Sequence, residues 1–290
     1  MKETSQTNRT IMSITAIVIG LLMIALIPFL VQTSLDRVLF HLTEHIEAGN
    51  PAFQSGIFLF DLFYPTWRAL IFVAGIALIL ISQEIRKGEE WTYPVAMALF
   101  ALPSIGGFFM FLPYISWVPG FPLPVVISMI GLVGYWIFIF LREAELNEKL
   151  IRFAALTLIG MLATHAFTIG IGAQRTMMTR PGHPFYQDLS WWIFNWAGTV
   201  NWVAVILLYL AIPFLSVGRR RGWWLAVIGA VAILAIDAPT QFIRTKTLDY
   251  LYGSLLAIGV IFFTVVPYFK DRLLQDTNQV SEPELQEATS

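Results

Sequence analysis

The chain has 290 residues, of which 57% are hydrophobic and 13% are charged. Soluble domains usually carry about 25% charged residues, so this composition predicts a surface that largely faces lipid. A formal net charge of -1, without a long basic run, gives no argument for nucleic-acid binding. The absence of cysteine excludes disulfides, thiolate metal sites and cysteine nucleophiles.

Eight continuous apolar runs are long enough to cross a bilayer as helices, which takes about 20 residues each. They cover residues 11–33, 66–84, 92–114, 122–141, 152–174, 191–216, 222–243 and 250–269. Because these runs do not alternate, they predict helices rather than barrel strands. The first run is too long for a signal-peptide core and no cleavage site follows it, so we expect a retained anchor helix. The predicted fold class is an all-α membrane protein of about eight transmembrane helices.

Landmarks in the first four runs recur in the second four. Phe58-Leu-Phe-Asp61 precedes the second run, and Phe185-Tyr-Gln-Asp188 precedes the sixth; a tryptophan follows each. Four spans per copy predict two parallel repeats related by an axis along the membrane normal. The alternative is that two apolar four-helix stretches resemble each other by composition alone. The predicted domains are 1–150 and 151–274, followed by a polar, acidic, disordered cytoplasmic tail at 275–290.

The basic residues predict the orientation in the membrane. If the N-terminus is cytoplasmic, twelve of the 18 lysines and arginines fall in inside segments, among them Arg219–Arg221. Cytoplasmic loops are enriched in such residues, so we expect a multi-pass protein of the cell membrane with both termini cytoplasmic. We interpret the arginine triplet as a topology anchor, with binding of anionic lipid headgroups as the alternative.

Polar side chains inside the spans are concentrated in the second half. At about 1.5 Å of rise per residue, three of them lie at similar depth in the outer leaflet, on consecutive helices. Residues four apart share a helix face, which adds two more positions, and two arginines lie at the rim. We therefore expect an outward-facing cavity between the fifth, sixth and seventh spans. The candidate ligand-binding or proton-coupling residues are His165, Asn195, Thr199, Asp237, Gln241, Arg175 and Arg244.

Pro239 gives a further reason to look near Asp237. A proline inside a helix removes a backbone hydrogen bond, and broken helices at membrane depth often line cavities. The alternative is that Asp237 is protonated, or is paired with His165 or Asn195 as a contact between helices without any further role.

One short motif suggests metal chemistry. His41-Leu-Thr-Glu44-His45 has the H-x-x-E-H spacing of one class of zinc proteases. A third ligand is needed, and the soluble scaffold of those enzymes is missing from this sequence. We therefore predict no metal, no cofactor and no catalytic residues, and leave open whether these three side chains bind a metal.

Three functions remain open. The first is a carrier- or receptor-like protein of the lipid bilayer whose cavity opens to the outside and binds a small anionic or lipid ligand. The second is a membrane enzyme acting on a lipid or isoprenoid, with His165 and Asp237 as acid and base. The third is an accessory subunit without a small-molecule site. Transport needs access from both sides, and the few polar groups in the inner half count against it. A cavity reaching His165 and Asp237 is the observation that separates them best.

Overall fold

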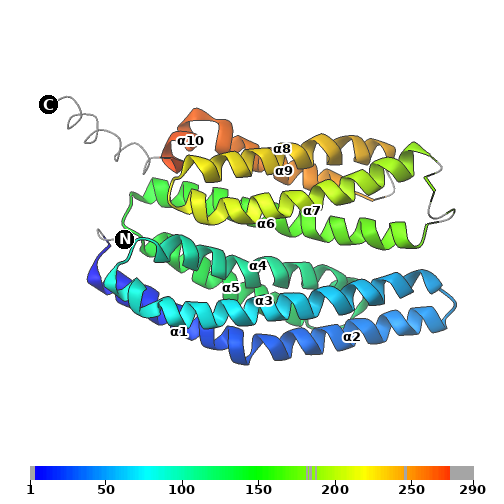
Figure 1. Ribbon diagram of the computed structural model, residues 1–290, viewed down its shortest axis with the longest axis horizontal. Coiled ribbons are helices and arrows are strands. Elements are labelled where there is room, and N and C mark those ends of the chain that lie inside the picture. Colours follow the sequence, from blue (N-terminus) through cyan, green and yellow to red (C-terminus); the bar gives the residue numbers. More distant parts are fainter. Residues whose placement is uncertain (1–3, 181, 183–184, 187, 245–246, 275–290) are drawn as a thin grey trace.

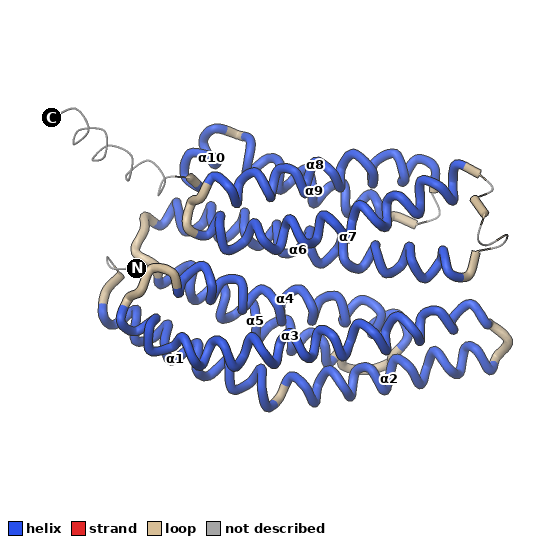
Figure 2. The backbone as a smooth tube through the Cα atoms, viewed as in Figure 1, coloured by secondary structure: helices blue, strands red, loops and turns tan. Residues whose placement is uncertain are grey.

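The computed structural model describes residues 4–180, 182, 185–186, 188–244 and 247–274. These ranges form a bundle of roughly parallel and antiparallel helices without strands (Figures 1 and 2). The elements are α1 (Gln6–Ala25), α2 (Ile27–Glu47), the short 3-10 helix η1 (Pro51–Phe53), α3 (Gln54–Lys87), α4 (Thr92–Trp117), α5 (Leu123–Leu141), α6 (Leu146–Met178), α7 (Leu189–Ser216), α8 (Arg220–Ile243), α9 (Asp249–Val265) and α10 (Pro267–Leu273).

The described helices form an apolar bundle that is compatible with a polytopic membrane protein. Seven are long and apolar enough to cross a bilayer, with α1 and α2 taken together as one of them. The pair α9 and α10 is bent by 75° and makes an eighth span when it is counted as one. The structure thus supports seven or eight spans.

The structure differs from the sequence prediction between the first two spans. Residues 34–65, expected as a connection, are mostly helical, because α2 runs to Glu47 and α3 begins at Gln54. Leu35, Val38 and Leu42 are buried at helical spacing and hold this extension of α2 against α3. Charged residues in the same stretch lower its hydropathy, which hides the helix from a search for apolar runs.

The helices form two sets that lie side by side, α1–α5 and α6–α10 (Figure 1). In each set, helices that follow one another in the chain pack together, and the last span also contacts the first. Helix α4 lies against α6 and α7, so it forms most of the contact between the sets. Asp61 lies inside α3, whereas Asp188 caps the N-terminus of α7 by accepting from the Trp191 amide at 3.0 Å. This pair of landmarks therefore sits differently in the two sets, and the internal repeat stays a prediction.

Basic residues gather at one end of the bundle, called here the basic end. Arg9 donates to the Lys87 carbonyl at 3.0 Å, and Arg142 and Arg152 both donate to the Ser216 carbonyl at 2.7 Å. Cations are favourable at helix C-termini, so these bonds stabilise the ends of α3 and α7. Helix α1 begins at this end and α10 lies there too (Figure 1). The other end, where α2 meets α3 and α6 meets α7, is called the distal end.

Candidate functional site

A buried polar pair lies between α7 and α8. Asp237 and Asn201 are both 0% exposed, and the Asn201 amide donates to Asp237 Oδ1 at 2.7 Å and to the Ala197 carbonyl at 2.9 Å. Asp237 Oδ2 and Asn201 Oδ1 are buried without a hydrogen-bond partner among the described residues. Unsatisfied polar atoms are costly inside a membrane protein, so this pair calls for an explanation beyond packing.

His165 of α6 lies next to this pair. Gly253 of α9 lies between them: a Cβ atom there would collide with Asp237 Oδ2 and come within 3.1 Å of the His165 ring. His165 Nε2 lies 2.8 Å from the Asp249 carbonyl, which can only accept, so Nε2 carries the hydrogen. In a neutral ring, Nδ1 is then an acceptor. The glycine thus lets a histidine and a carboxyl group approach each other across three helices.

A cavity of about 500 Å³ opens at the distal end of the second set. It is lined by α6, α7 and the connection between α8 and α9, and both Arg175 and Arg244 belong to its wall. Arg244 lies 3.9 Å above the Phe194 ring and donates to Ser190 Oγ at 3.3 Å. Arg175 lies near the rings of Phe53 and Trp117, at 5.8 and 5.7 Å. We call this the arginine cavity.

The charge in the arginine cavity is only partly balanced. Asp249 also lines it. In the described part of the chain, however, no carboxylate oxygen lies within 4.0 Å of a side-chain nitrogen of Arg175 or Arg244. The arginines lie against aromatic rings instead, and apart from the Arg244 bond to Ser190 their hydrogen-bond donors are available for an anion.

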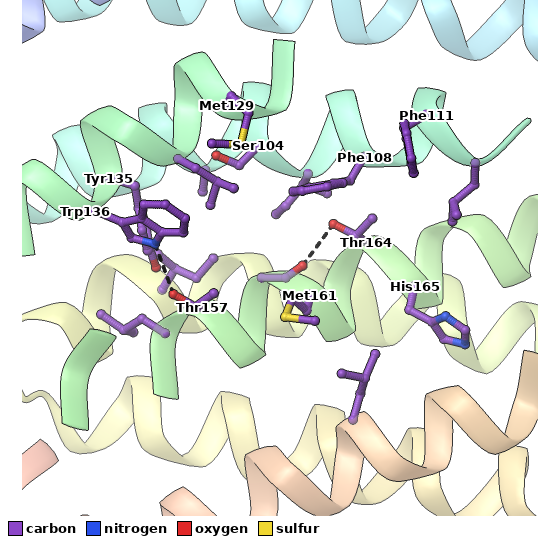
Figure 3. A pocket seen from close by; sticks show the side chains of 18 residues that line it. Ser104, Phe108, Phe111, Met129, Tyr135, Trp136, Thr157, Met161, Thr164 and His165 are labelled. Carbon is purple, nitrogen blue, oxygen red and sulfur yellow. Dashed lines mark hydrogen bonds between the residues drawn. The ribbon is translucent and has the colours of Figure 1, made fainter. Parts of the chain in front are cut away.

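A second cavity, of about 440 Å³, lies deeper, between α4 and α5 of the first set and α6 of the second (Figure 3). It is lined by apolar side chains such as Phe108, Met129 and Met161, with His165 at one end and Trp136 towards the other (Figure 3). Thr164 donates to its own helix at the Gly160 carbonyl, so it adds little polarity. We call this space the apolar cleft.

The polar side chains of the apolar cleft differ in whether they have a hydrogen-bond partner. Ser104 donates to the Phe100 carbonyl at 2.9 Å, and Trp136 Nε1 donates to Thr157 Oγ1 at 3.3 Å. The hydroxyl of Tyr135, by contrast, is buried without a partner among the described residues. The lining is therefore almost entirely apolar or internally bonded.

The sequence candidates separate into three groups in the structure. His165 and Asp237 are neighbours, and Arg175 and Arg244 share one cavity. Asn195, Thr199 and Gln241 line neither cavity.

Thr199 is exposed and bonds to carbonyls of its own helix, and no side-chain hydrogen bond joins Asn195 to Asp237. Gln241 bridges the connection between α8 and α9: it donates to the Thr247 carbonyl at 2.8 Å and accepts from the Leu251 amide at 2.9 Å. From the sequence, Asn195 was selected by its depth and Thr199 by the helix face that it shares with Asn195, and Asn201 was left out of the site. Asn201 shares a helical face with Ala197, Ala204 and Leu208, and this run of small and apolar residues facing α8 is the signal that points to it.

The H-x-x-E-H motif does not form a converging set of ligands. His41 Nδ1 lies 2.8 Å from Glu44 Oε2, while the His45 ring stacks on Phe53 with centroids 4.8 Å apart. Within the described ranges, no group of three or more His, Cys, Asp or Glu side chains is placed to hold a metal ion.

Comparisons of the chain with protein-family models, with curated proteins and with solved structures found no match.

Proposed function

We propose that the protein is a carrier- or receptor-like membrane protein that binds a small anionic ligand in the arginine cavity. The observation that carries this proposal is the presence of Arg175 and Arg244 on the wall of one cavity, without a carboxylate paired to either in the described chain. Guanidinium groups bind carboxylate and phosphate oxygens through paired, charge-assisted hydrogen bonds. An anion there replaces the water that otherwise solvates the two charges.

The buried pair of Asp237 and Asn201 supports a carrier-like role. Asp237 receives a single amide donor at membrane depth and lies beside His165, so gain or loss of a proton changes its interactions strongly. The His165 ring is bonded to the Asp249 carbonyl, and Asp249 lines the arginine cavity. Ligand binding and proton exchange are therefore coupled through α9 in this proposal.

The test is a binding measurement with butyl phosphate on protein in lipid nanodiscs. We expect saturable binding that weakens by about tenfold or more in Arg175→Gln and in Arg244→Gln, since hydrogen bonds to charged groups contribute about 1.5–3 kcal/mol. The control is Arg37→Gln, which removes an arginine that bonds to Tyr114 outside the cavity. Binding that is absent, or that is equally strong in all three variants, overturns the proposal.

A membrane enzyme acting on a lipid or isoprenoid is the second candidate. The position of His165 at the end of the apolar cleft, with Asp237 behind it, favours it, because an imidazole and a carboxyl group can act as acid and base. Chemical conversion of a lipid by the wild type, lost in His165→Gln while butyl phosphate still binds, would favour this candidate over a carrier. An accessory subunit would show neither binding nor conversion.

The same proposal places the protein in the cell membrane, with eight spans, both termini cytoplasmic and the arginine cavity outside. The gathering of Arg9, Arg142, Arg152 and the Arg219–Arg221 triplet near the basic end supports this orientation. It also treats the two four-helix sets as parallel repeats, which is supported by their similar order of packing. Superposition of the two sets about an axis along the bundle tests the repeat.

A further inference from the structure

The two cavities lie one after the other along α6. Going towards the distal end, this helix lines the apolar cleft from Leu156 to His165 and the arginine cavity from Ile169 to Thr176. Helix α9 repeats the order, with Leu256 in the cleft and Asp249 and Tyr250 in the arginine cavity. His165 therefore lies between an apolar space and a cationic one.

The length of the two cavities along α6 fits a ligand with a long hydrocarbon chain better than a compact ligand. Ile169 lies thirteen positions after Leu156 on α6, which corresponds to about 20 Å along the helix axis. The cleft residues come from the middle of α4, α5 and α6, so they lie at the depth of the hydrocarbon core. Met129 of α5 and Met161 of α6 line the cleft and are 41% and 48% exposed, and from this exposure we infer that the cleft opens to surrounding lipid chains between these two helices.

We propose that the apolar cleft binds the hydrocarbon chain of a single-chain anionic amphiphile, which enters from the bilayer between α5 and α6. This inference rests on the proposed function, because the anionic head of the same molecule occupies the arginine cavity. The charge of Arg175 and Arg244 fits the head, and the apolar lining around Phe108 and Met161 fits the chain. The ligand class is thus a long-chain phosphate or carboxylate, whose head is the small anionic group of the proposed function.

Two glycines of α6 give a matched pair of variants. A Cβ atom at Gly160, in the cleft, meets nothing within 4 Å, and the same holds at Gly172, in the arginine cavity. A side chain at either position starts in open space, so Gly160→Leu projects into the space proposed for the chain and Gly172→Leu into the space proposed for the head. Thermal unfolding of both variants in detergent shows whether they fold like the wild type.

The experiment uses hexadecyl phosphate with a photoactivatable diazirine near the end of its chain, incorporated into nanodiscs with the protein. After illumination, mass spectrometry locates the adducts. We expect them around Phe108, Met129 and Met161, with about tenfold less labelling there in Gly160→Leu. Labelling scattered over lipid-facing residues such as Leu80 and Val203, or cleft labelling that Gly160→Leu leaves unchanged, overturns the inference.

The outcomes distinguish this inference from the proposed function. If butyl phosphate binds through the arginines but the long-chain probe does not label the cleft, the anion site stands and the chain site is wrong. If the cleft is labelled equally in wild type, Arg175→Gln, Arg244→Gln and Gly172→Leu, the head does not occupy the arginine cavity and the inference is wrong, whereas the proposed function falls only if butyl phosphate binding is absent or unchanged in the arginine variants. If labelling of the cleft decreases in Gly160→Leu and in both arginine variants, the result supports both the chain site and the proposed function.

Discussion

At the scale of single residues, Gly253 is the position on which the polar cluster depends. A Cβ atom there would collide with Asp237 Oδ2 and press on the His165 ring. Both groups are confined, because Asn201 holds the carboxyl group and the Asp249 carbonyl holds the ring. A methyl group at this position therefore has to move a helix or break one of these hydrogen bonds.

We predict that Gly253→Ala lowers the free energy of unfolding by about 1–3 kcal/mol, the usual cost of overpacking. Gly259→Ala on the same helix is the control, since its Cβ meets only the Leu158 side chain at 3.5 Å and 3.8 Å, which is ordinary contact. Thermal unfolding in detergent measures both. Equal melting temperatures for the two variants would contradict the close approach of α6, α8 and α9 at Gly253.

Two buried tyrosines give a second comparison at this scale. The Tyr64 hydroxyl donates to the Met110 carbonyl at 3.1 Å, whereas the Tyr135 hydroxyl has no partner in the described part of the chain. Loss of a satisfied hydrogen bond costs about 1 kcal/mol, but removal of an unsatisfied buried hydroxyl is neutral or stabilising. We expect Tyr64→Phe to lower the melting temperature and Tyr135→Phe to leave it unchanged or raise it. A fall in Tyr135→Phe as large as in Tyr64→Phe would show that a partner such as a ligand satisfies Tyr135.

At the scale of the helices, the contact between α1 and α3 depends on two glycines that face each other. A Cβ at Gly75 would lie 2.8 Å from the Gly20 carbonyl oxygen, and a Cβ at Gly20 would lie 2.8 Å from the Gly75 carbonyl oxygen. Small residues let membrane helices approach closely and gain packing energy. Because the opposing atoms belong to the backbone, a methyl group forces the two helices apart.

We predict that Gly75→Ala destabilises the folded protein by about 1–3 kcal/mol. Gly160→Ala, with open space around its Cβ, is the matched control and should unfold at the wild-type temperature. The measurement is unfolding in detergent followed by tryptophan fluorescence. A Gly75→Ala variant as stable as Gly160→Ala would mean that α1 and α3 pack less closely than described here.

The helices in the structure can be compared with the spans predicted from the sequence. The apolar runs predicted the spans because a bilayer demands about 20 apolar residues from each helix. The extensions of α2 and α3 were missed, because Asp36 and Arg37 interrupt the hydropathy although the helical spacing of buried residues continues. For the candidate site, equal depth was enough to predict His165 near Asp237. Asn201, which donates to Asp237, was not selected from the sequence, because hydropathy does not show which face of an apolar helix meets its neighbour.

The apolar cleft was not predictable for a related reason. Its walls consist of Phe, Met, Leu and Ile side chains that are ordinary in any membrane span, and only the arrangement of α4, α5 and α6 leaves the space between them. The two arginines were expected at the rim of a cavity that reaches His165 and Asp237, whereas in the structure His165 lines the apolar cleft and Asp237 lines neither cavity. The position of an apolar cavity depends on the packing of the whole bundle.

At the scale of the whole molecule, the orientation of the bundle in the membrane decides whether the arginine cavity faces the outside or the cytoplasm. The basic end carries Arg142 and Arg152 on the Ser216 carbonyl, and the positive-inside rule predicts that this end faces the cytoplasm. The chain contains no cysteine, so each engineered cysteine is a unique label. Four exposed positions serve as reporters, two at the distal end and two at the basic end: Asn50, Ser116, Glu90 and Glu145.

We predict that Asn50→Cys and Ser116→Cys react with a membrane-impermeant maleimide added to intact cells. Glu90→Cys and Glu145→Cys should react only after the membrane is permeabilised, because their connections then lie in the cytoplasm. Agreement of all four positions is needed, since a single accessible site can arise from a minor misinserted population. Labelling of the Glu90 and Glu145 positions in intact cells, with protection of the other two, would turn the arginine cavity towards the cytoplasm. The ligand would then have to be sought among intracellular anions, and the outward-facing part of the proposed function would be wrong.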